Sequence, residues 1–217
     1  MKKFILALSI TALTAAMSFA QADDYKKGEG YIGYSNAQVD TGIDSDDDLS
    51  EFFNDRVTLH GVNVSGVYNM NRYFGLKGDI SAAFNSRRDT VSLTSGGNTL
   101  DVSAKTNNSL YNFVGGVQLK DNSREGRFKP FAHAMIGGAH ARTKINDFVC
   151  EPSNLCAAVV IAPESFNSTG FSGVFGGGLD IRVSDRFQVR AFQVDYNPTR
   201  IEGITQHNAR FGAGIVF

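Results

Sequence analysis

Apolar residues recur at every second position in several stretches that are longer than ordinary strands. The segment FGLKGDISAAF places Phe74, Ile80 and Phe84 on one face and Lys77 and Asp79 on the other. Comparable stretches cover residues 111–120 and 171–183. A period of two predicts a β-strand with one apolar and one polar face. Strands in globular sheets have about 5–6 residues, whereas about 10 suit a tilted strand that crosses a hydrocarbon layer.

Further segments carry the same pattern, all but the last of them less regularly, and bring the predicted number of strands to eight. They cover residues 28–37, 58–68, 128–141, 187–196 and the C-terminal stretch that ends at 217. Within 187–196 the apolar phase shifts, which predicts a β-bulge near Phe192. An even number of amphipathic strands predicts an all-β fold, an eight-stranded antiparallel up-and-down transmembrane barrel with both termini on one side.

The predicted connections between these strands alternate in length. Those at 69–73, 121–127 and 184–186 are short, those at 38–57, 86–107 and 142–168 are long, and 197–207 is intermediate. Short turns on one rim and long loops on the other are typical of outer-membrane barrels.

The N-terminus has the features of an export signal. Two lysines precede an apolar stretch, and Ala20 and Ala22 form a small-residue cleavage site. We therefore predict a signal peptide at 1–22 and a single outer-membrane barrel domain at 23–217. The predicted mature chain has 19 basic and 22 acidic residues, and this net charge of −3 gives no reason to expect a nucleic-acid partner.

Charged side chains on the polar strand faces are expected inside the barrel. An eight-stranded barrel is only wide enough inside for its own side chains, and the bulky apolar faces suit lipid. Buried charges persist when they are paired and hydrogen-bonded. The expected network is a structural plug, with an ion path as the alternative. Its predicted members are Lys77, Asp79, Lys120, Asp180, Arg182, Arg190, Asp195 and Arg210.

The chain ends with NARFGAGIVF, in which apolar residues alternate up to the last position. This ending resembles the C-terminal signature of bacterial outer-membrane proteins, which the barrel-assembly machinery reads. Together with FSGVFGGGLDIRVSDRFQVRAFQVDYNPTR at 171–200, it resembles the last three strands of small OmpA-like "outer membrane protein beta-barrel" domains. The assembly signal would comprise Phe211, Ala213, Ile215 and Phe217.

This resemblance implies a bacterial outer-membrane protein with a role in membrane integrity, surface contact or slow diffusion, and no conserved chemistry. The expected partners are outer-membrane lipids, lipopolysaccharide and, during biogenesis, the barrel-assembly machinery. We expect a monomer without a cofactor. Arg87 and Arg88 lie where a strand is predicted to leave the membrane. They either contact lipopolysaccharide phosphates or are simply hydrated.

Two features of the predicted loops were weighed as binding or covalent sites. Cys150 and Cys156 are the two cysteines of the chain, and an even count in an exported protein predicts a disulfide. An acidic loop has the D-x-D-x-D spacing of a calcium loop, but Leu49 stands where such a loop needs glycine. We therefore predict no strong metal site at the partial match, which comprises Asp44, Asp46, Asp48 and Asp55.

Four functional classes are compatible with these patterns. The favoured class is a non-enzymatic barrel that acts structurally or through its outer loops. A narrow pore is the second, limited by barrel width. A lipid A-modifying enzyme is the third, and it needs a lipid-facing serine beside a histidine, which the sequence does not reveal. A soluble, exported lipocalin-like binding barrel is the fourth, and it requires aromatics inside and charges outside.

Overall fold

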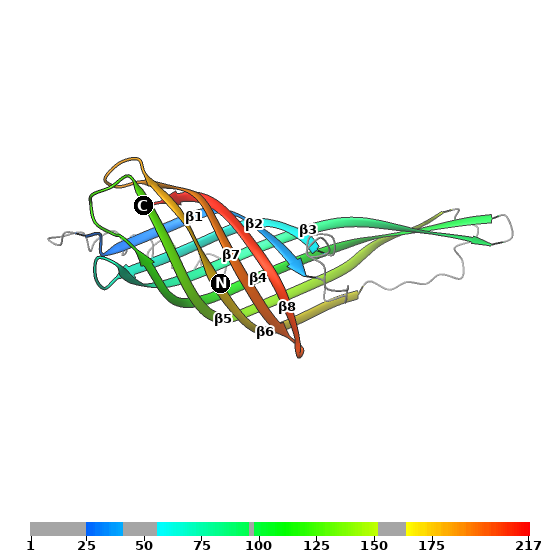
Figure 1. Ribbon diagram of the computed structural model, residues 1–217. Helices are drawn as coiled ribbons and strands as arrows, with labels where there is room; N and C mark the ends of the chain where they lie inside the picture. The colour runs from blue at the N-terminus through cyan, green and yellow to red at the C-terminus, as the bar shows by residue number, and fades with distance from the viewer. Residues whose placement is uncertain (1–24, 41–55, 96–97, 152–163) are drawn as a thin grey trace, which may run out of the picture.

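The computed structural model describes residues 25–40, 56–95, 98–151 and 164–217, which form one closed barrel (Figure 1). Every strand is antiparallel to its neighbours, and β1 closes the ring with β8. The predicted eight-stranded up-and-down barrel is therefore confirmed. The strands are β1 Gly28–Asp40, β2 Arg56–Asn69, β3 Phe74–Ser95, β4 Asn98–Lys120, β5 Phe128–Glu151, β6 Glu164–Arg182, β7 Gln188–Ile201 and β8 Ile204–Val216.

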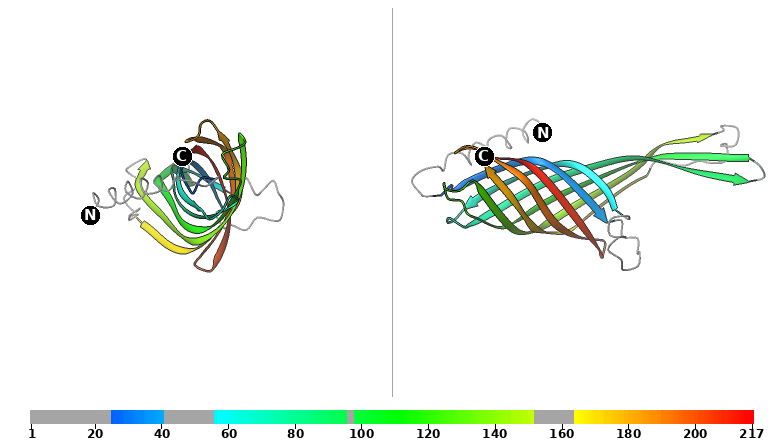
Figure 2. Two further views of the ribbon diagram at one scale, coloured as in Figure 1. Left: turned by 90° about the vertical axis from the view of Figure 1, so that its left-hand side faces the viewer. Right: turned by 45° about the horizontal axis from the view of Figure 1, so that its top comes forward.

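The strands are strongly tilted because their hydrogen-bond register is staggered around the ring (Figure 2). A path through directly paired residues from Asn69 on β2 returns to β2 at Leu59, ten residues away. With about 3.3 Å per residue and about 4.8 Å between strands, this stagger gives a tilt of about 40°. The apolar face from Phe74 to Phe84 then rises about 25 Å, the height of the apolar band of an outer-membrane barrel.

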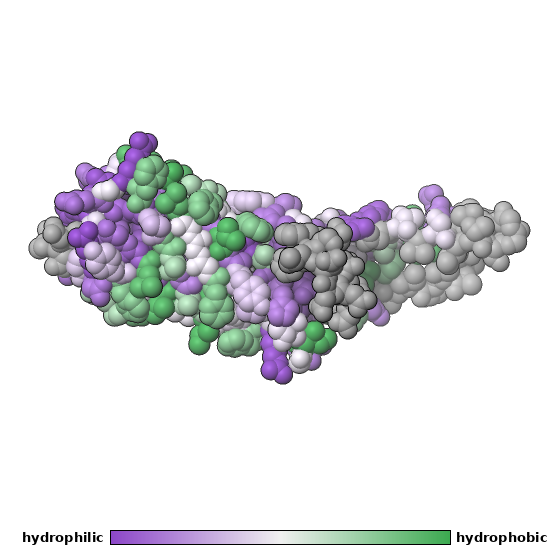
Figure 3. Space-filling model, viewed as in Figure 1, coloured by the Kyte–Doolittle hydropathy of each residue, from purple (hydrophilic) through white to green (hydrophobic). Residues whose placement is uncertain are grey.

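The barrel wall is apolar outside and charged inside. Phe113 and Phe175 are 54% and 47% exposed, whereas Lys77, Asp180 and Arg210 are 3%, 0% and 3% exposed. Figure 3 shows apolar residues gathered over the barrel wall, with hydrophilic residues towards the turns. This polarity is the reverse of what a lipocalin-like barrel requires, so that alternative is wrong.

Aromatic side chains border the apolar band at both ends. Such girdles are characteristic of membrane barrels, because aromatic rings suit the interface between hydrocarbon and water. We call the rim with the turns 70–73, 121–127 and 183–187 the short-turn rim, and the opposite end the outer rim. Exposed aromatics are Tyr68, Tyr73, Phe128 and Phe187 near the short-turn rim, and Tyr34, Phe84, Phe171 and Tyr196 towards the outer rim.

Three strands continue far beyond the wall and correct the prediction of long loops. Residues 86–107 are mostly strand, because β3 and β4 remain paired up to Ser95 and Asn98. Much of 142–168 is strand as well, since β5 runs to Glu151 and β6 begins at Glu164. The apolar alternation of the wall is interrupted where β3 leaves it, by polar residues that include Arg87, Arg88 and Asp89. Figure 1 shows the extension of β3–β5 projecting from the outer rim.

Two local predictions in β7 and β8 have different outcomes. The bulge near Phe192 is confirmed: Ala191 and Phe192 are both exposed, and the register with β6 and β8 shifts here. The prediction of an intermediate loop at 197–207 is wrong, because β7 and β8 remain paired up to Ile201 and Ile204. The remaining turn is Glu202-Gly203, with φ of 53° and 86°, as in two-residue type I′ hairpins. Among the described residues there is no helix that is long and apolar enough to cross a membrane.

Candidate functional site

Lys120 is the centre of a buried ion cluster close to the short-turn rim. Its Nζ lies 2.8 Å from Asp180 Oδ2 and 2.8 Å from Glu29 Oε2, and it donates to Gln188 Oε1 at 3.0 Å. Arg190 completes the cluster with two hydrogen bonds to Asp180, at 2.8 and 3.1 Å. Ion pairs and hydrogen bonds thus connect β1, β4, β6 and β7 inside the barrel, near their ends at the short-turn rim.

A second ion cluster, centred on Arg210, lies at mid-barrel. Arg210 donates to Asp79 Oδ1 at 2.9 Å and to Asp195 Oδ2 at 2.8 Å. The ring nitrogen Nε2 of His133 lies 2.9 Å from Asp195 Oδ1. Gln193 joins the two clusters, since it accepts from Arg190 at 2.7 Å and donates to Asp195 at 2.6 Å.

The combined network fills the lumen with paired charges and packed rings. The Arg190 guanidinium lies 4.2 Å from the Tyr31 ring centre and 4.0 Å from that of Phe131. Lys77 Nζ lies 3.1 Å from His133 Nδ1 and 5.5 Å from the Phe131 ring centre. The lumen therefore contains alternating side chains of opposite sign, in the arrangement that buried charges require.

Seven of the eight residues predicted for the lumen network are brought together in it. Arg182 is the exception, and this part of the prediction is wrong. It lies at the end of β6, where its partly exposed side chain is 3.5 Å from Asp185 in the adjoining turn. Sequence reasoning missed Glu29, His133, Gln188 and Gln193. All four lie at strand positions whose side chains alternate into the lumen. The sequence carried this signal for His133, because Phe131 and Met135 lie two positions away on either side and point the same way.

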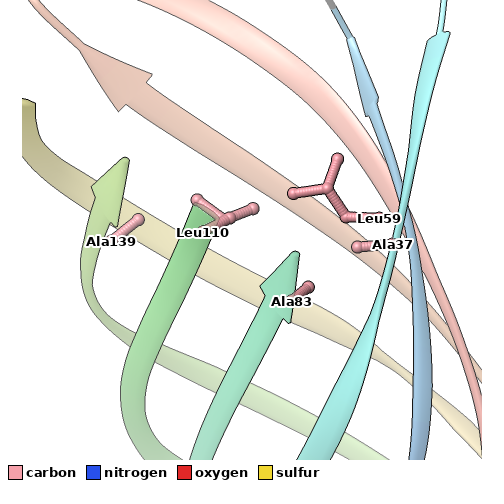
Figure 4. Close-up of a cluster of buried hydrophobic side chains, with 5 residues drawn as sticks. All are labelled: Ala37, Leu59, Ala83, Leu110 and Ala139. Carbon is pink, nitrogen blue, oxygen red and sulfur yellow. The ribbon is translucent and has the colours of Figure 1, made fainter. Parts of the chain in front are cut away.

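Above the ion clusters, the lumen has an apolar wall and a hydrogen-bonding wall. The strands β1–β5 each contribute one small or branched apolar side chain (Figure 4), namely Ala37, Leu59, Ala83, Leu110 and Ala139. On the other wall, Asn197 donates to Ser172 at 2.8 Å, and Asn208 donates to Thr199 at 3.0 Å. These buried amides and hydroxyls satisfy one another, and none of them carries a charge.

A shallow cavity of about 250 Å³ lies above this layer at the outer rim. Leu59 and Leu110 contribute to its base, and Val39 and Val57 to its side, while Asn108 and other polar residues line its edge. Towards the short-turn rim, it is followed first by the apolar layer and then by the ion clusters.

Three histidines face outward, each beside a tyrosine, near the aromatic residues that border the apolar band towards the outer rim. The Tyr34–His60 and Tyr196–His207 pairs are hydrogen-bonded and stacked. The His140 ring lies 6.3 Å from the ring of its cross-strand neighbour Tyr111. Sequence reasoning missed these pairs because the partners lie on different strands and no local spacing links them.

The hydrogen-bond partners of the outward histidines also test the alternative of a lipid A-modifying enzyme. His140 Nδ1 is hydrogen-bonded to Thr169 Oγ1 at 2.8 Å. In the part of the chain that the structure describes, no outward imidazole is hydrogen-bonded to a serine hydroxyl or to a carboxylate. A hydroxyl nucleophile ordinarily needs both a base and a group that orients the base.

The C-terminal strand is fixed against β1. Phe217 exchanges two backbone hydrogen bonds with Gly30, at 2.8 and 2.9 Å. Its ring covers Gly30 so closely that an added Cβ there would lie 2.5 Å from a ring carbon. The other three residues of the predicted assembly signal, Phe211, Ala213 and Ile215, are exposed on the outer wall.

Several predicted sites lie outside the described residues. Cys150 lies in β5, but Cys156 does not belong to the described ranges, so their disulfide stays a prediction. The partial calcium motif also falls outside, with Asp44, Asp46, Asp48 and Asp55. Within the described ranges, no three His, Cys, Asp or Glu side chains gather where they could hold a metal ion.

Comparison with known proteins adds the family to this geometry. The model of the outer membrane protein beta-barrel domain matches residues 7–217. The chain belongs to this outer membrane protein beta-barrel family. Membership in this family indicates a location in the bacterial outer membrane, as the resemblance implied. No curated protein sequence matches the chain.

Solved structures with similar folds are other small outer-membrane barrels. Ail, the attachment invasion locus protein of Yersinia pestis, in complex with the heparin analogue sucrose octasulfate, is 17% identical. The match covers 88% of this chain and 99% of Ail, with a TM-score of 0.52. Neisserial surface protein A is 10% identical, with 89% and 98% covered and a TM-score of 0.46. OprG from Pseudomonas aeruginosa is 15% identical, with 88% and 96% covered and a TM-score of 0.38. At these identities the likeness concerns the fold alone.

Proposed function

We propose that this family member is a non-enzymatic outer-membrane barrel with a plugged lumen, which acts at the cell surface through the extension of β3–β5. The observation that carries the proposal is the combination of a lumen filled with paired charges and strands that continue well beyond the aromatic border. A chain that only needed to span the membrane would have no use for strands of 22 to 24 residues.

Two layers in series argue against a narrow pore. An ion that entered the outer cavity would first meet an uncharged layer, with Leu59 and Leu110 on one wall and amides and hydroxyls that already satisfy one another on the other. It would then have to separate pairs such as Lys120–Asp180, in which both side chains are fully buried. Separating a buried ion pair leaves an uncompensated charge and is strongly unfavourable.

The catalytic alternative is disfavoured by the outward histidines, whose described side-chain partners are tyrosine, threonine and asparagine rather than serine and a carboxylate. Mass spectrometry of lipid A from cells with and without the protein tests this point. We expect identical acylation, and a missing or added acyl chain would contradict the proposal.

Planar-bilayer recording tests the plug. The refolded protein, identified by its different gel mobility before and after boiling, should produce no regular conductance steps. A Leu59→Ala/Leu110→Ala variant widens the apolar layer but retains the ion clusters, so it should also stay closed. Regular steps with the unaltered protein would overturn the plug.

A shortened hairpin tests the surface role. Arg88 and Lys105 are direct cross-strand partners, so replacing residues 89–104 with Asn-Gly gives a two-residue hairpin turn. The shortened protein should still insert and shift on gels, because the wall is unchanged. Attachment of expressing cells to immobilised extracellular glycans and proteins should fall. Equal attachment by both forms would count against the surface role.

The proposed partners follow from this arrangement. The apolar band contacts lipid, and the C-terminal strand from Phe211 to Phe217 presents the signal for the barrel-assembly machinery. We propose a monomer, because closure of β1 onto β8 leaves no free strand edge within the wall.

A further inference from the structure

Two neighbouring turns at the short-turn rim carry a group of arginines. The turn 121–127 joins β4 to β5 and the turn 183–187 joins β6 to β7, and they lie side by side because β5 and β6 are paired (Figure 1). The backbone N–H of Arg182 donates to the carbonyl of Arg127 at 2.8 Å, which fixes the start of one turn against the end of the other. Three arginines of these turns are exposed, and we call them the turn arginines: Arg124, Arg127 and Arg186.

The turn arginines form no ion pair within the described part of the protein. The carboxylates nearby are mostly engaged elsewhere. Asp121 accepts two hydrogen bonds from Arg72, at 2.9 and 3.2 Å, and Asp185 lies 3.5 Å from Arg182. Glu125 is exposed and is the carboxylate of these turns that remains available. Three arginine charges thus face one carboxylate, which leaves net positive charge on this side of the rim.

A buried lysine holds the first turn in place and adds to its positive charge. Lys129 is 3% exposed, and its Nζ donates to the backbone carbonyls of Asp121 at 3.0 Å and Glu125 at 2.7 Å. Carbonyl groups accept these hydrogen bonds but carry no net charge. Within the described ranges no carboxylate pairs with this ammonium group. The turn is therefore ordered around a cation, and an anion outside it would improve the charge balance.

An apolar platform lies on the membrane side of the turn arginines. Phe128, Val183 and Phe187 are 64%, 70% and 52% exposed. Val183 and Phe187 are adjacent, since the N–H of the first donates to the carbonyl of the second at 3.1 Å. Phe128 and Phe187 each directly follow a turn arginine in the chain. With the tilt derived above, one residue along a strand changes the height by about 2.5 Å, so the cations lie at the edge of the apolar band.

The turn between β2 and β3 at the same rim differs in its charge. It also places an arginine beside an exposed aromatic residue, because the Arg72 guanidinium lies 5.2 Å from the Tyr73 ring centre. Here, however, the positive charge is compensated by Asp121 at 2.9 Å. The combination of an apolar platform with uncompensated arginines is therefore a feature of the β5–β7 side, and the β2–β3 turn provides a matched reference.

We propose that the turn arginines bind the phosphate group of an anionic phospholipid in the inner leaflet of the outer membrane, with its acyl chains against the apolar platform. Short turns of outer-membrane barrels face the periplasm, so this site lies opposite the β3–β5 extension and goes beyond the proposed function. Arginine can hold a phosphate with two parallel hydrogen bonds. The strands β5 and β7 lie about 10 Å apart across β6, so Arg127 and Arg186 can approach one headgroup from two sides. A lipid fits better than a soluble polyanion, because the platform continues the apolar wall. No covalent step is involved.

Tryptophan quenching by brominated lipids tests the site, because the chain has no tryptophan of its own. Phe187→Trp places a reporter in the platform, and Tyr73→Trp places a reference beside the compensated Arg72. The refolded protein is inserted into mixed vesicles in which either phosphatidylglycerol or phosphatidylcholine carries bromine on its acyl chains. One cation near an anionic lipid changes affinity about fivefold, so the Phe187→Trp reporter should favour phosphatidylglycerol about fivefold or more. The reference should show little preference.

Charge variants in the Phe187→Trp protein connect this preference to the arginines. Arg127→Gln/Arg186→Gln should remove most of it, because the phosphate loses two of its three cations. Arg88→Gln/Arg200→Gln removes the same charge from exposed residues towards the outer rim and should leave the preference intact. Gel mobility before and after boiling shows whether each variant is folded.

Four outcomes would overturn the inference. Equal quenching by the two lipids at Phe187→Trp is the first, and an equal loss in both charge variants is the second. Complete suppression by millimolar inorganic phosphate is the third, and it would identify free phosphate as the ligand. The fourth is binding of purified peptidoglycan through the same arginines without any lipid preference, which would assign the rim to a carboxylate-bearing polymer. Attachment and conductance are not measured here, so a failure of this site is distinguishable from a failure of the proposed function.

Discussion

Removal of Lys120 is the most direct test of the lumen network. In Lys120→Met, the aliphatic stem is retained but the positive charge between Glu29 and Asp180 is lost. Asp180 keeps its two hydrogen bonds from Arg190, whereas Glu29 keeps only a weak one from Gln188 at 3.4 Å. The variant therefore leaves one carboxylate buried without compensation. Such losses lower the free energy of unfolding by about 3–5 kcal/mol.

A double-mutant cycle isolates this cause. In Glu29→Gln/Lys120→Met both charges are absent, so the loss should be smaller than the sum of the two single losses. Coupling between contacting residues is about 0.5–3 kcal/mol, and this fully buried pair should lie in the upper part of that range. The exposed pair Arg72–Asp121 at the same rim is the matched control, since surface ion pairs contribute little.

Unfolding in urea, in detergent or lipid vesicles, measures these differences. The chain has no tryptophan, so gel mobility and far-UV circular dichroism are suitable probes. If Lys120→Met lies within about 1 kcal/mol of the unaltered protein, or if the cycle is additive, the network does not stabilise the barrel in the way that the structure indicates.

Three further predictions concern the rims. The hydrogen bond from Arg72 holds the pKa of the Asp121 carboxyl below its usual range, so their stabilisation is complete above about pH 5 and is lost as the pH falls below about 4. Unfolding curves should therefore show the difference from Arg72→Gln shrinking towards pH 2, and a constant difference would refute this. Gly203 has a φ of 86°, and Gly203→Ala should lower stability by about 1 kcal/mol in urea unfolding; an unchanged midpoint would contradict the turn geometry. Phe217→Ala uncovers Gly30 and should reduce the heat-modifiable protein in outer-membrane fractions, whereas undiminished amounts would show that the ring is dispensable.

The barrel wall was predictable because its two environments differ strongly. Lipid outside and a charged lumen inside impose a two-residue period, so the sequence predicted the number of strands and the inward side of Lys77 and Arg210. A shift in the phase of this two-residue period located the bulge near Phe192. Just beyond the outer rim the period is interrupted by polar residues that include Arg87, Arg88 and Asp89. For this reason the sequence predicted loops where β3, β4 and β5 continue.

The candidate sites were predictable only in part. Parity placed seven of the network residues on inward faces, but the same rule was not applied to Glu29 and His133. Arg182 is charged like the residues of the network, but β6 ends at this position, so its side chain lies beside the adjoining turn rather than inside the lumen.

The sequence alone determined that this chain forms an inside-out cylinder, since alternation is a local property of each strand. Only the tertiary structure decided which charges meet: Arg210 and Asp79 are 131 positions apart, and Lys120 and Glu29 are 91 apart. Their pairing depends on the stagger of ten residues around the ring, which sets the height of every side chain in the lumen. This stagger arises from closure of all eight strands together, so no single segment of the sequence encodes it.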